Sequence, residues 1–100
     1  MGYTSFEDLA VWKRSARLAV RVYDALRDCR DYGLKDQMPR AAVSIASNIA
    51  EGAERDSRSE YILFLHIAKG SAAELRTQVY IAQRIGVFSA SHASDPTRQS

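Results

Sequence analysis

Apolar residues recur along most of the chain at alternating steps of three and four, which is the spacing of one face of an α-helix. The first apolar line comprises Leu9, Trp12, Ala16, Ala19, Tyr23 and Leu26. Ser5 precedes this line and is followed three residues later by Asp8, a pattern similar to a helix-capping box. The pattern predicts a first helix over residues 6–29, about 36 Å long at the standard rise per residue.

A second apolar line predicts a helix over residues 34–53, with Gly52 as its terminator. The line comprises Met38, Ala42, Ile45 and Ile49. Pro39 lies inside this segment, and a proline in a helix interior removes one hydrogen bond and clashes with the preceding turn. Two interpretations are open: the regular helix begins close to Pro39, or residues 34–38 form a separate turn joined to the helix by a kink.

The longest periodic segment begins with Ser57 and Glu60, which have the spacing of a capping box, and predicts a helix over residues 57–85 that stops at Gly86. Its apolar line comprises Tyr61, Leu65, Ala68, Ala72, Leu75, Val79 and Ala82. A second line on the opposite side, with Glu74 inside it, comprises Leu63, Ile67, Gly70, Ile81 and Ile85. Two apolar lines predict contacts on two sides of this helix. Gly70 either allows another helix to approach closely or is simply tolerated.

Three apolar lines with this alternation favour nearly aligned helices, and short connections between them favour antiparallel neighbours. The predicted fold is therefore all-α, an antiparallel up-down helical bundle over residues 1–86. Residues 87–100 are polar, small and aperiodic. We expect them to form a flexible tail, because they carry too little apolar surface to pack as a helix.

The segment from Ala41 to Ala50 carries no charged residue and consists mostly of small side chains. A helix of this composition has no solvated face, so we expect it to be buried on more than one side. A chain of 100 residues leaves a large fraction of its surface exposed, which makes such burial hard to achieve within one molecule. The segment therefore predicts self-association.

Composition limits the classes of function. Fourteen Lys and Arg against twelve Asp and Glu give a net charge of +2, so binding to nucleic acid would depend on local clustering of charge. Cys29 is the only cysteine, which is typical of a cytoplasmic protein in a reducing compartment. The first residues do not resemble a secretory signal, and the absence of an apolar run of about 18 residues predicts no membrane-spanning helix.

A row of basic residues is predicted on the first helix, opposite its apolar line. The row comprises Lys13, Arg14, Arg17 and Arg21. Its three arginines fall within about 60° of one another around the helix, and such a row can bind phosphates. Glu7, Asp24 and Asp28 share the same side, and a row of mixed charge is also typical of a solvated face. Both interpretations are open.

A polar stripe follows the second helix, opposite its apolar line. It comprises Arg40, Ser44, Ser47 and Glu51, with Asn48 beside them. These residue types suit a buried hydrogen-bonded network at a subunit contact, with Glu74 of the third helix as a candidate partner. A structural role is favoured over a catalytic one, because no adjacent nucleophile and base accompany the carboxylates. No spacing of His or Cys predicts a metal site, no motif predicts a cofactor, and we expect no enzymatic activity.

Three separated blocks of the sequence carry a family resemblance. The first contains Phe6–Leu9 with Val11 and Trp12, the second contains Tyr32–Leu34 and Gln37–Gly52, and the third contains Glu60, Phe64, Leu65, Ile67, Ala68, Gly70, Ser71, Glu74 and Leu75. These blocks resemble the small four-helix-bundle proteins encoded in 23S ribosomal RNA intervening sequences. The resemblance implies a homo-oligomer, a ring of five. It also implies a fourth helix, which the polar tail does not predict.

We therefore expect a non-enzymatic homo-oligomeric scaffold that binds nucleic acid, structured RNA in particular, through the basic row of the first helix. The resemblance supports this expectation, because the family is linked to ribosomal RNA and is similar to an accessory protein of diversity-generating retroelements that associates with a reverse transcriptase. The alternative is a protein-interaction adaptor. In that case, a missing fourth helix exposes the line Leu63, Ile67, Ile81 and Ile85 to a helix of a partner protein.

Overall fold

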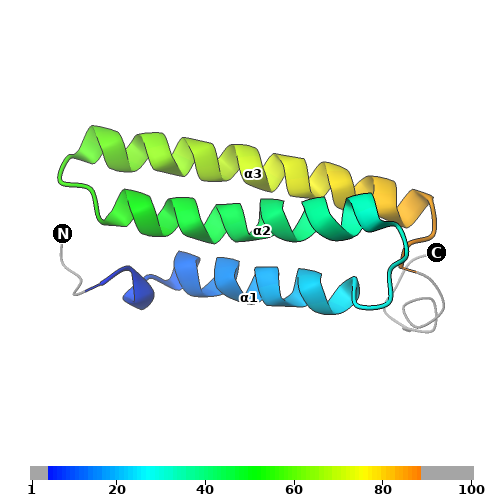
Figure 1. Cartoon of the computed structure of the whole chain (residues 1–100). Helices are drawn as coiled ribbons and strands as arrows, with labels where there is room; N and C mark the ends of the chain where they lie inside the picture. Colours follow the sequence, from blue (N-terminus) through cyan, green and yellow to red (C-terminus); the bar gives the residue numbers. More distant parts are fainter. Residues whose placement is uncertain (1–4, 89–100) are drawn as a thin grey trace.

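The computed structural model describes residues 5–88, in which three α-helices run alternately up and down (Figure 1). A short 3-10 turn, η1 (Phe6–Asp8), is followed by α1 (Ala10–Ala25), α2 (Tyr32–Ala53) and α3 (Arg58–Arg84). No strand occurs within residues 5–88. The all-α antiparallel bundle predicted from the apolar spacing is confirmed. Residues 89–100, which make up most of the predicted tail, lie outside the described residues.

The first helix is shorter at both ends than the predicted range of 6–29. The backbone at Leu9 is extended, with φ −75° and ψ 125°, and it separates η1 from α1. The buried line of α1 comprises Ser15, Ala19 and Val22 and continues to Leu26 beyond the helix. Tyr23, which the apolar spacing placed in the core line, is 58% exposed, because the buried line passes through the neighbouring Val22 instead.

The second helix is continuous from Tyr32 through Pro39, so both interpretations of Pro39 were wrong. The helix begins earlier than predicted, because Asp31 caps it: the backbone N–H of Leu34 donates to Asp31 Oδ1 at 3.1 Å. Pro39 is buried. Because Pro39 has no backbone N–H, one hydrogen bond of the helix is missing there. The helix continues on both sides of Pro39.

Gly52 is not a terminator, because it lies inside α2, which ends at Ala53. A Cβ added to Gly52 would lie 2.8 Å from the Cβ of Phe64 and 3.1 Å from Cδ1 of Tyr61. Real Cβ atoms essentially never approach to 2.8 Å. The glycine is therefore required by the close approach of α3 to the end of α2.

The third helix was predicted to within one residue at each end. Ser57 Oγ accepts a hydrogen bond from the backbone N–H of Glu60 at 3.1 Å, as the capping-box pattern indicated. At the other end Gly86 has a positive φ of 81°. Backbone bonds from Val87 N to Ala82 O (2.9 Å) and from Gly86 N to Gln83 O (3.3 Å) form a Schellman motif there. This turn brings Val87 and the following Phe88, both assigned to the tail by the sequence, against the core.

The middle position in the bundle belongs to α2, which packs against α1 on one side and α3 on the other (Figure 1). No Cα atom of α1 lies within 8 Å of a Cα atom of α3. The core is formed around α2 by Ala41, Ala42, Ile45 and Ile49, together with the fully buried Leu26 and Met38. The uncharged composition of α2 is thus explained by burial between two helices of the same chain, and it does not by itself require a second copy.

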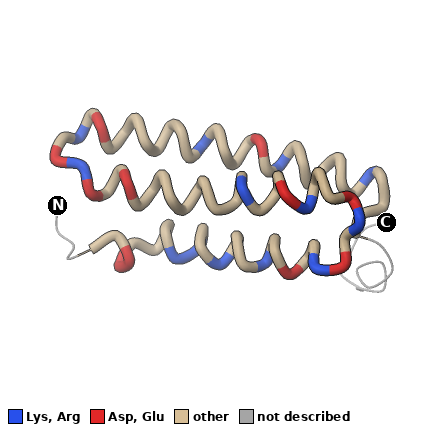
Figure 2. Tube along the Cα trace, in the orientation of Figure 1, with Lys and Arg blue, Asp and Glu red and all other residues tan. Residues whose placement is uncertain are grey.

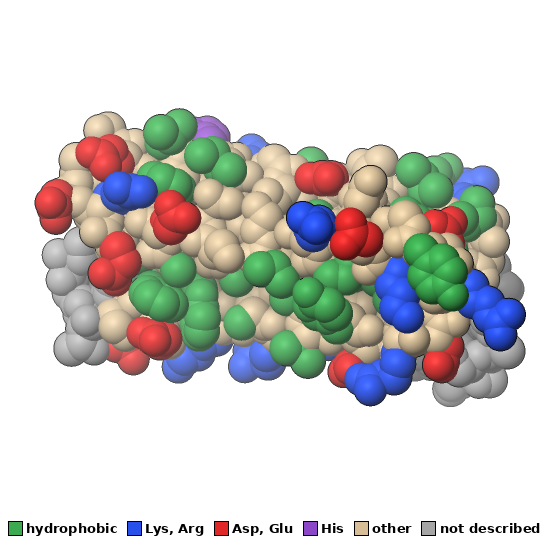
Figure 3. Space-filling view, in the orientation of Figure 1, with side chains coloured by type: hydrophobic (Ala, Val, Ile, Leu, Met, Phe, Trp, Pro, Cys, Tyr) green, Lys and Arg blue, Asp and Glu red, His purple; other side chains and the backbone are tan. Residues whose placement is uncertain are grey.

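Apolar side chains remain uncovered outside this core. On α3 they form the second line that the sequence predicted, comprising Leu63, Ile67, Ile81 and Ile85, which are 44–57% exposed. Within residues 5–88 no element covers this line, so the predicted second set of contacts is not made there. A Cβ added to Gly70, in the same line, would meet no atom within 4 Å. In the view of Figure 3, hydrophobic side chains also gather along the boundary between α1 and α2.

Candidate nucleic-acid interface

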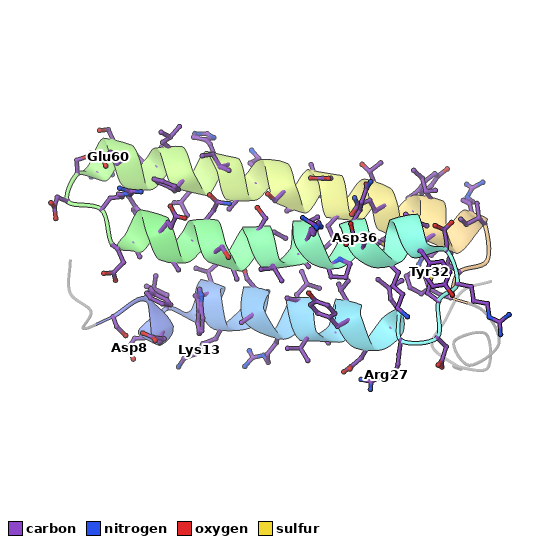
Figure 4. All side chains as sticks on the ribbon, in the orientation of Figure 1. Asp8, Lys13, Arg27, Tyr32, Asp36 and Glu60 are labelled. Carbon is purple, nitrogen blue, oxygen red and sulfur yellow. The ribbon has the colours of Figure 1, made fainter. Side chains whose placement is uncertain are left out.

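The four basic residues of the predicted row lie on the exposed surface of α1. Lys13, Arg14, Arg17 and Arg21 are all exposed. Figure 2 shows their basic positions following α1 along the edge of the bundle, and Figure 4 places Lys13 at that edge. The placement follows from the helical repeat, because α1 buries the side that carries Ala19 and Val22 and leaves the opposite side in solvent.

The charge of the row is not compensated by ion pairs within residues 5–88. Asp24, an acidic residue on the same side, is paired with Arg27. No salt bridge or hydrogen bond joins Arg14, Arg17 or Arg21 to any described carboxylate. Three guanidinium groups are therefore free to turn toward an external anion.

A shallow hollow of about 610 Å³ lies among these arginines. It is lined by Val11, Arg14, Ser15, Arg17, Leu18 and Arg21. The hydroxyl of Ser15 donates to the carbonyl of Val11 at 2.8 Å and so is already bonded within the helix. The arginines supply the remaining polar groups, and their planar forks match the geometry of phosphate oxygens.

The polar stripe of α2 is only partly a network. Ser44 Oγ lies 2.8 Å from Ser71 Oγ of α3. The Nδ2 group of Asn48 donates to the carbonyl oxygen of Ser44 at 2.8 Å and to Ser44 Oγ at 3.0 Å. These half-buried bonds join α2 to α3 within one chain. The prediction missed Ser71, because nothing in the spacing along either helix shows which residues of the two helices meet.

The other members of the stripe are separate from this network. Arg40 pairs with Asp36 at 3.2 Å and Glu51 pairs with Arg55 at 3.4 Å, each at the exposed surface of α2 or just beyond its end. Ser47 is exposed. Glu74 is the acceptor for Nε2 of Gln78 on its own helix, at 3.4 Å. Within the described chain Glu74 does not pair with the α2 stripe, and Ser71 lies opposite Ser44. The expected pairing of Glu74 with the stripe across a subunit contact stays a prediction. The partners Asp36 and Arg55 were readable from the sequence, since each lies four residues from the charge that it pairs with.

Other candidate chemistry is sparse within residues 5–88. His66 is exposed, and Cys29 is buried with its Sγ 3.5 Å from the carbonyl oxygen of Asp31. No group of three or more His, Cys, Asp or Glu residues in the described part of the chain is arranged to hold a metal ion. None of the described helices is long and apolar enough to cross a membrane.

The fold and this site define an antiparallel helical-bundle protein with a row of unpaired arginines along its first helix. The family model of the 23S rRNA-intervening sequence protein matches residues 7–99 of the chain. The chain belongs to this family, as the three blocks of resemblance predicted. No curated protein sequence matches the chain.

Proposed function

We propose that this protein is a cytoplasmic, non-enzymatic, homo-oligomeric scaffold that binds structured RNA through Lys13, Arg14, Arg17 and Arg21. The observation that carries the proposal is the exposed row of arginines on α1 whose charge no described carboxylate neutralises. Phosphate contacts by Arg and Lys supply most of the affinity of sequence-independent binding to nucleic acid. The family name, which links these proteins to inserts in ribosomal RNA, supports RNA over DNA as the ligand.

The oligomeric part of the proposal rests on uncovered apolar surface. Large apolar side chains remain exposed in the described structure. They are the four residues of the line on α3 and, in addition, Val20, Tyr23 and Val43. Contiguous apolar surface on a small protein usually marks an interface. Assembly of several copies, five by the family resemblance, would repeat the arginine row around a ring. Each chain carries a net charge of only +2, so this repetition would be the main source of binding strength.

The test compares two variants that lose the same charge. The first is Arg14→Gln/Arg17→Gln/Arg21→Gln, which removes the row. The matched control is Arg40→Gln/Arg55→Gln/Arg84→Gln, which removes three arginines elsewhere on the surface. We expect the first variant to bind a labelled RNA hairpin at least tenfold more weakly than the unmodified protein and the control to bind nearly as well, by fluorescence anisotropy at fixed salt. Equal losses in both variants, or no loss in either, would contradict the proposal.

A second candidate function is that of a protein-interaction adaptor. The observation that favours it is uncovered apolar surface beside the core, including the exposed line Leu63, Ile67, Ile81 and Ile85 on α3. A partner helix could bury such a surface. Salt-sensitive retention on an RNA column distinguishes the two functions, because an adaptor without an RNA site elutes at low salt.

A further inference from the structure

An apolar groove runs between α1 and α3 on one side of α2. One part of it is a hollow of about 470 Å³, with Leu18 and Val22 from α1, Met38 from α2, and Val79 and Phe88 on the α3 side. We call these five residues, together with Leu65 and Ala72 of α3, the α1–α3 groove. The groove exists because the backbones of α1 and α3 do not meet across α2.

This groove is not the surface on which the sequence placed a missing helix. Val79 lines the groove, whereas Ile81 belongs to the exposed second line of α3. Two residues along a helix correspond to a rotation of about 200°, so the two surfaces lie on different sides of α3. The apolar line Leu63, Ile67, Ile81 and Ile85 therefore cannot form the floor of the groove.

A line of half-buried apolar residues on α3 connects this hollow with a second one. Leu65, Ala72 and Val79 repeat every seven residues on one side of the helix and are all half-buried. Leu65 also lines a second hollow, of about 540 Å³, together with Tyr61, Ile62 and Arg58. From Leu65 to Val79 the helix rises by about 21 Å. The groove is thus long enough to accommodate about four turns of a helix.

Both rims of the groove are basic. On α1, Arg21 lines the hollow and Arg14 lies two turns before it, while Leu18 is shared with the hollow among the arginines. On α3, Lys69 and Arg76 are exposed and follow Leu65 and Ala72 at a step of four, which places them on the groove side. No ion pair within residues 5–88 involves any of these four cations.

Asp24 and Asp56 are the acidic residues that line the two hollows, and Arg55 and Arg58 line the second hollow beside Asp56. Asp24 lines the hollow and is already paired with Arg27. Glu74 lies two residues from Arg76, so it faces away from the groove by the same rotation of about 200°. An apolar floor between two uncompensated basic rims is complementary to a helix with an apolar face and acidic edges.

We propose that the α1–α3 groove binds an amphipathic helix of a partner protein, about four turns long, with Asp or Glu on both sides of its apolar face. Apolar residues of that helix at positions i, i+3, i+4 and i+7 would cover the floor, and its carboxylates would reach Arg14 and Arg21 on one rim and Lys69 and Arg76 on the other. A second copy of this chain does not fit this description, because its uncovered apolar line on α3 has Glu74 inside it instead of carboxylates along both edges. The proposal does not depend on RNA binding.

The test uses two synthetic helical peptides of 18 residues with the same leucine positions, one with Glu and one with Lys at the edges of the apolar face. A third peptide has the acidic composition in scrambled order. We expect the unmodified full-length protein to bind the Glu peptide at least tenfold more tightly than the Lys peptide, by fluorescence anisotropy of labelled peptides. We expect the scrambled peptide not to bind.

Two variants locate the binding surface. Lys69→Glu/Arg76→Glu should abolish the preference, because the α3 rim becomes acidic while Arg14 and Arg21 keep the α1 rim basic, so that the Glu and Lys peptides bind about equally. Arg40→Glu/Arg84→Glu carries the same change of charge outside the groove and should keep the original preference. The proposal is overturned if the two variants behave alike, if the scrambled peptide binds as well as the ordered one, or if assembly of the protein itself excludes both peptides.

Discussion

Ser44 Oγ of α2 and Ser71 Oγ of α3 lie 2.8 Å apart, and Asn48 Nδ2 donates to the same Ser44 hydroxyl at 3.0 Å. The bond joins the two helices across their boundary. Ser71→Ala should therefore lower the free energy of unfolding by about 1 kcal/mol, the usual net value of one hydrogen bond. Ser44→Ala should cost more, because it also removes an acceptor for Asn48.

Denaturant unfolding of the two single variants and of Ser44→Ala/Ser71→Ala checks this relationship. Because both substitutions break the same bond, the loss in the double variant should be smaller than the sum of the two single losses. Strictly additive losses would show that the two hydroxyls do not interact in solution.

Gly52→Ala should destabilise the protein by about 1–3 kcal/mol, the usual cost of forcing extra volume into a packed site. The added Cβ would lie 2.8 Å from the Cβ of Phe64, where neither helix has a flexible side-chain end that could move aside. Chemical denaturation measures the effect. A variant as stable as the unmodified protein would mean that α2 and α3 are farther apart at this point.

Gly70→Ala should have the opposite effect and stabilise the protein by up to about 1 kcal/mol, because alanine has the higher helix propensity. The Cβ would meet no atom of the described chain within 4 Å. Gly70→Ala, measured by the same denaturation experiment, is the matched control for Gly52→Ala. A marked loss of stability or a change of assembly state would indicate that another subunit packs closely at Gly70.

The proposed assembly predicts a solution mass that is a multiple of the 11.2 kDa chain, near five chains. Light scattering behind a sizing column measures this mass directly and independently of molecular shape. A stable monomer at the concentrations used for RNA binding would remove the scaffold part of the proposal, and the arginine row would then act as a single short site.

The local features of the fold could be predicted from the sequence. The start of α3 was predictable because Ser57 and Glu60 interact within one turn, and its end because Gly86 adopts the positive φ that only glycine adopts easily. The exposed arginine row was predictable for the same reason, since the apolar spacing of α1 determines which side faces solvent.

Features that depend on the meeting of two helices could not be predicted. Gly52 resembles a helix terminator in sequence, but its role depends on the approach of Phe64 from α3. Ser71 has no signal in its own helix that identifies Ser44 as its partner. The α1–α3 groove could not be predicted, because its two basic rims come from helices that are far apart in the sequence. Arg21 belongs to α1 and Arg76 to α3.

The central claim, that α1 binds RNA through its unpaired arginines, is tested most directly by the salt dependence of RNA affinity of the unmodified protein. Contacts from Lys13, Arg14, Arg17 and Arg21 to phosphates should give a plot of log K against log salt concentration with a slope of about −2 to −4 per chain. A slope near zero, or no measurable binding at low salt, would contradict the claim.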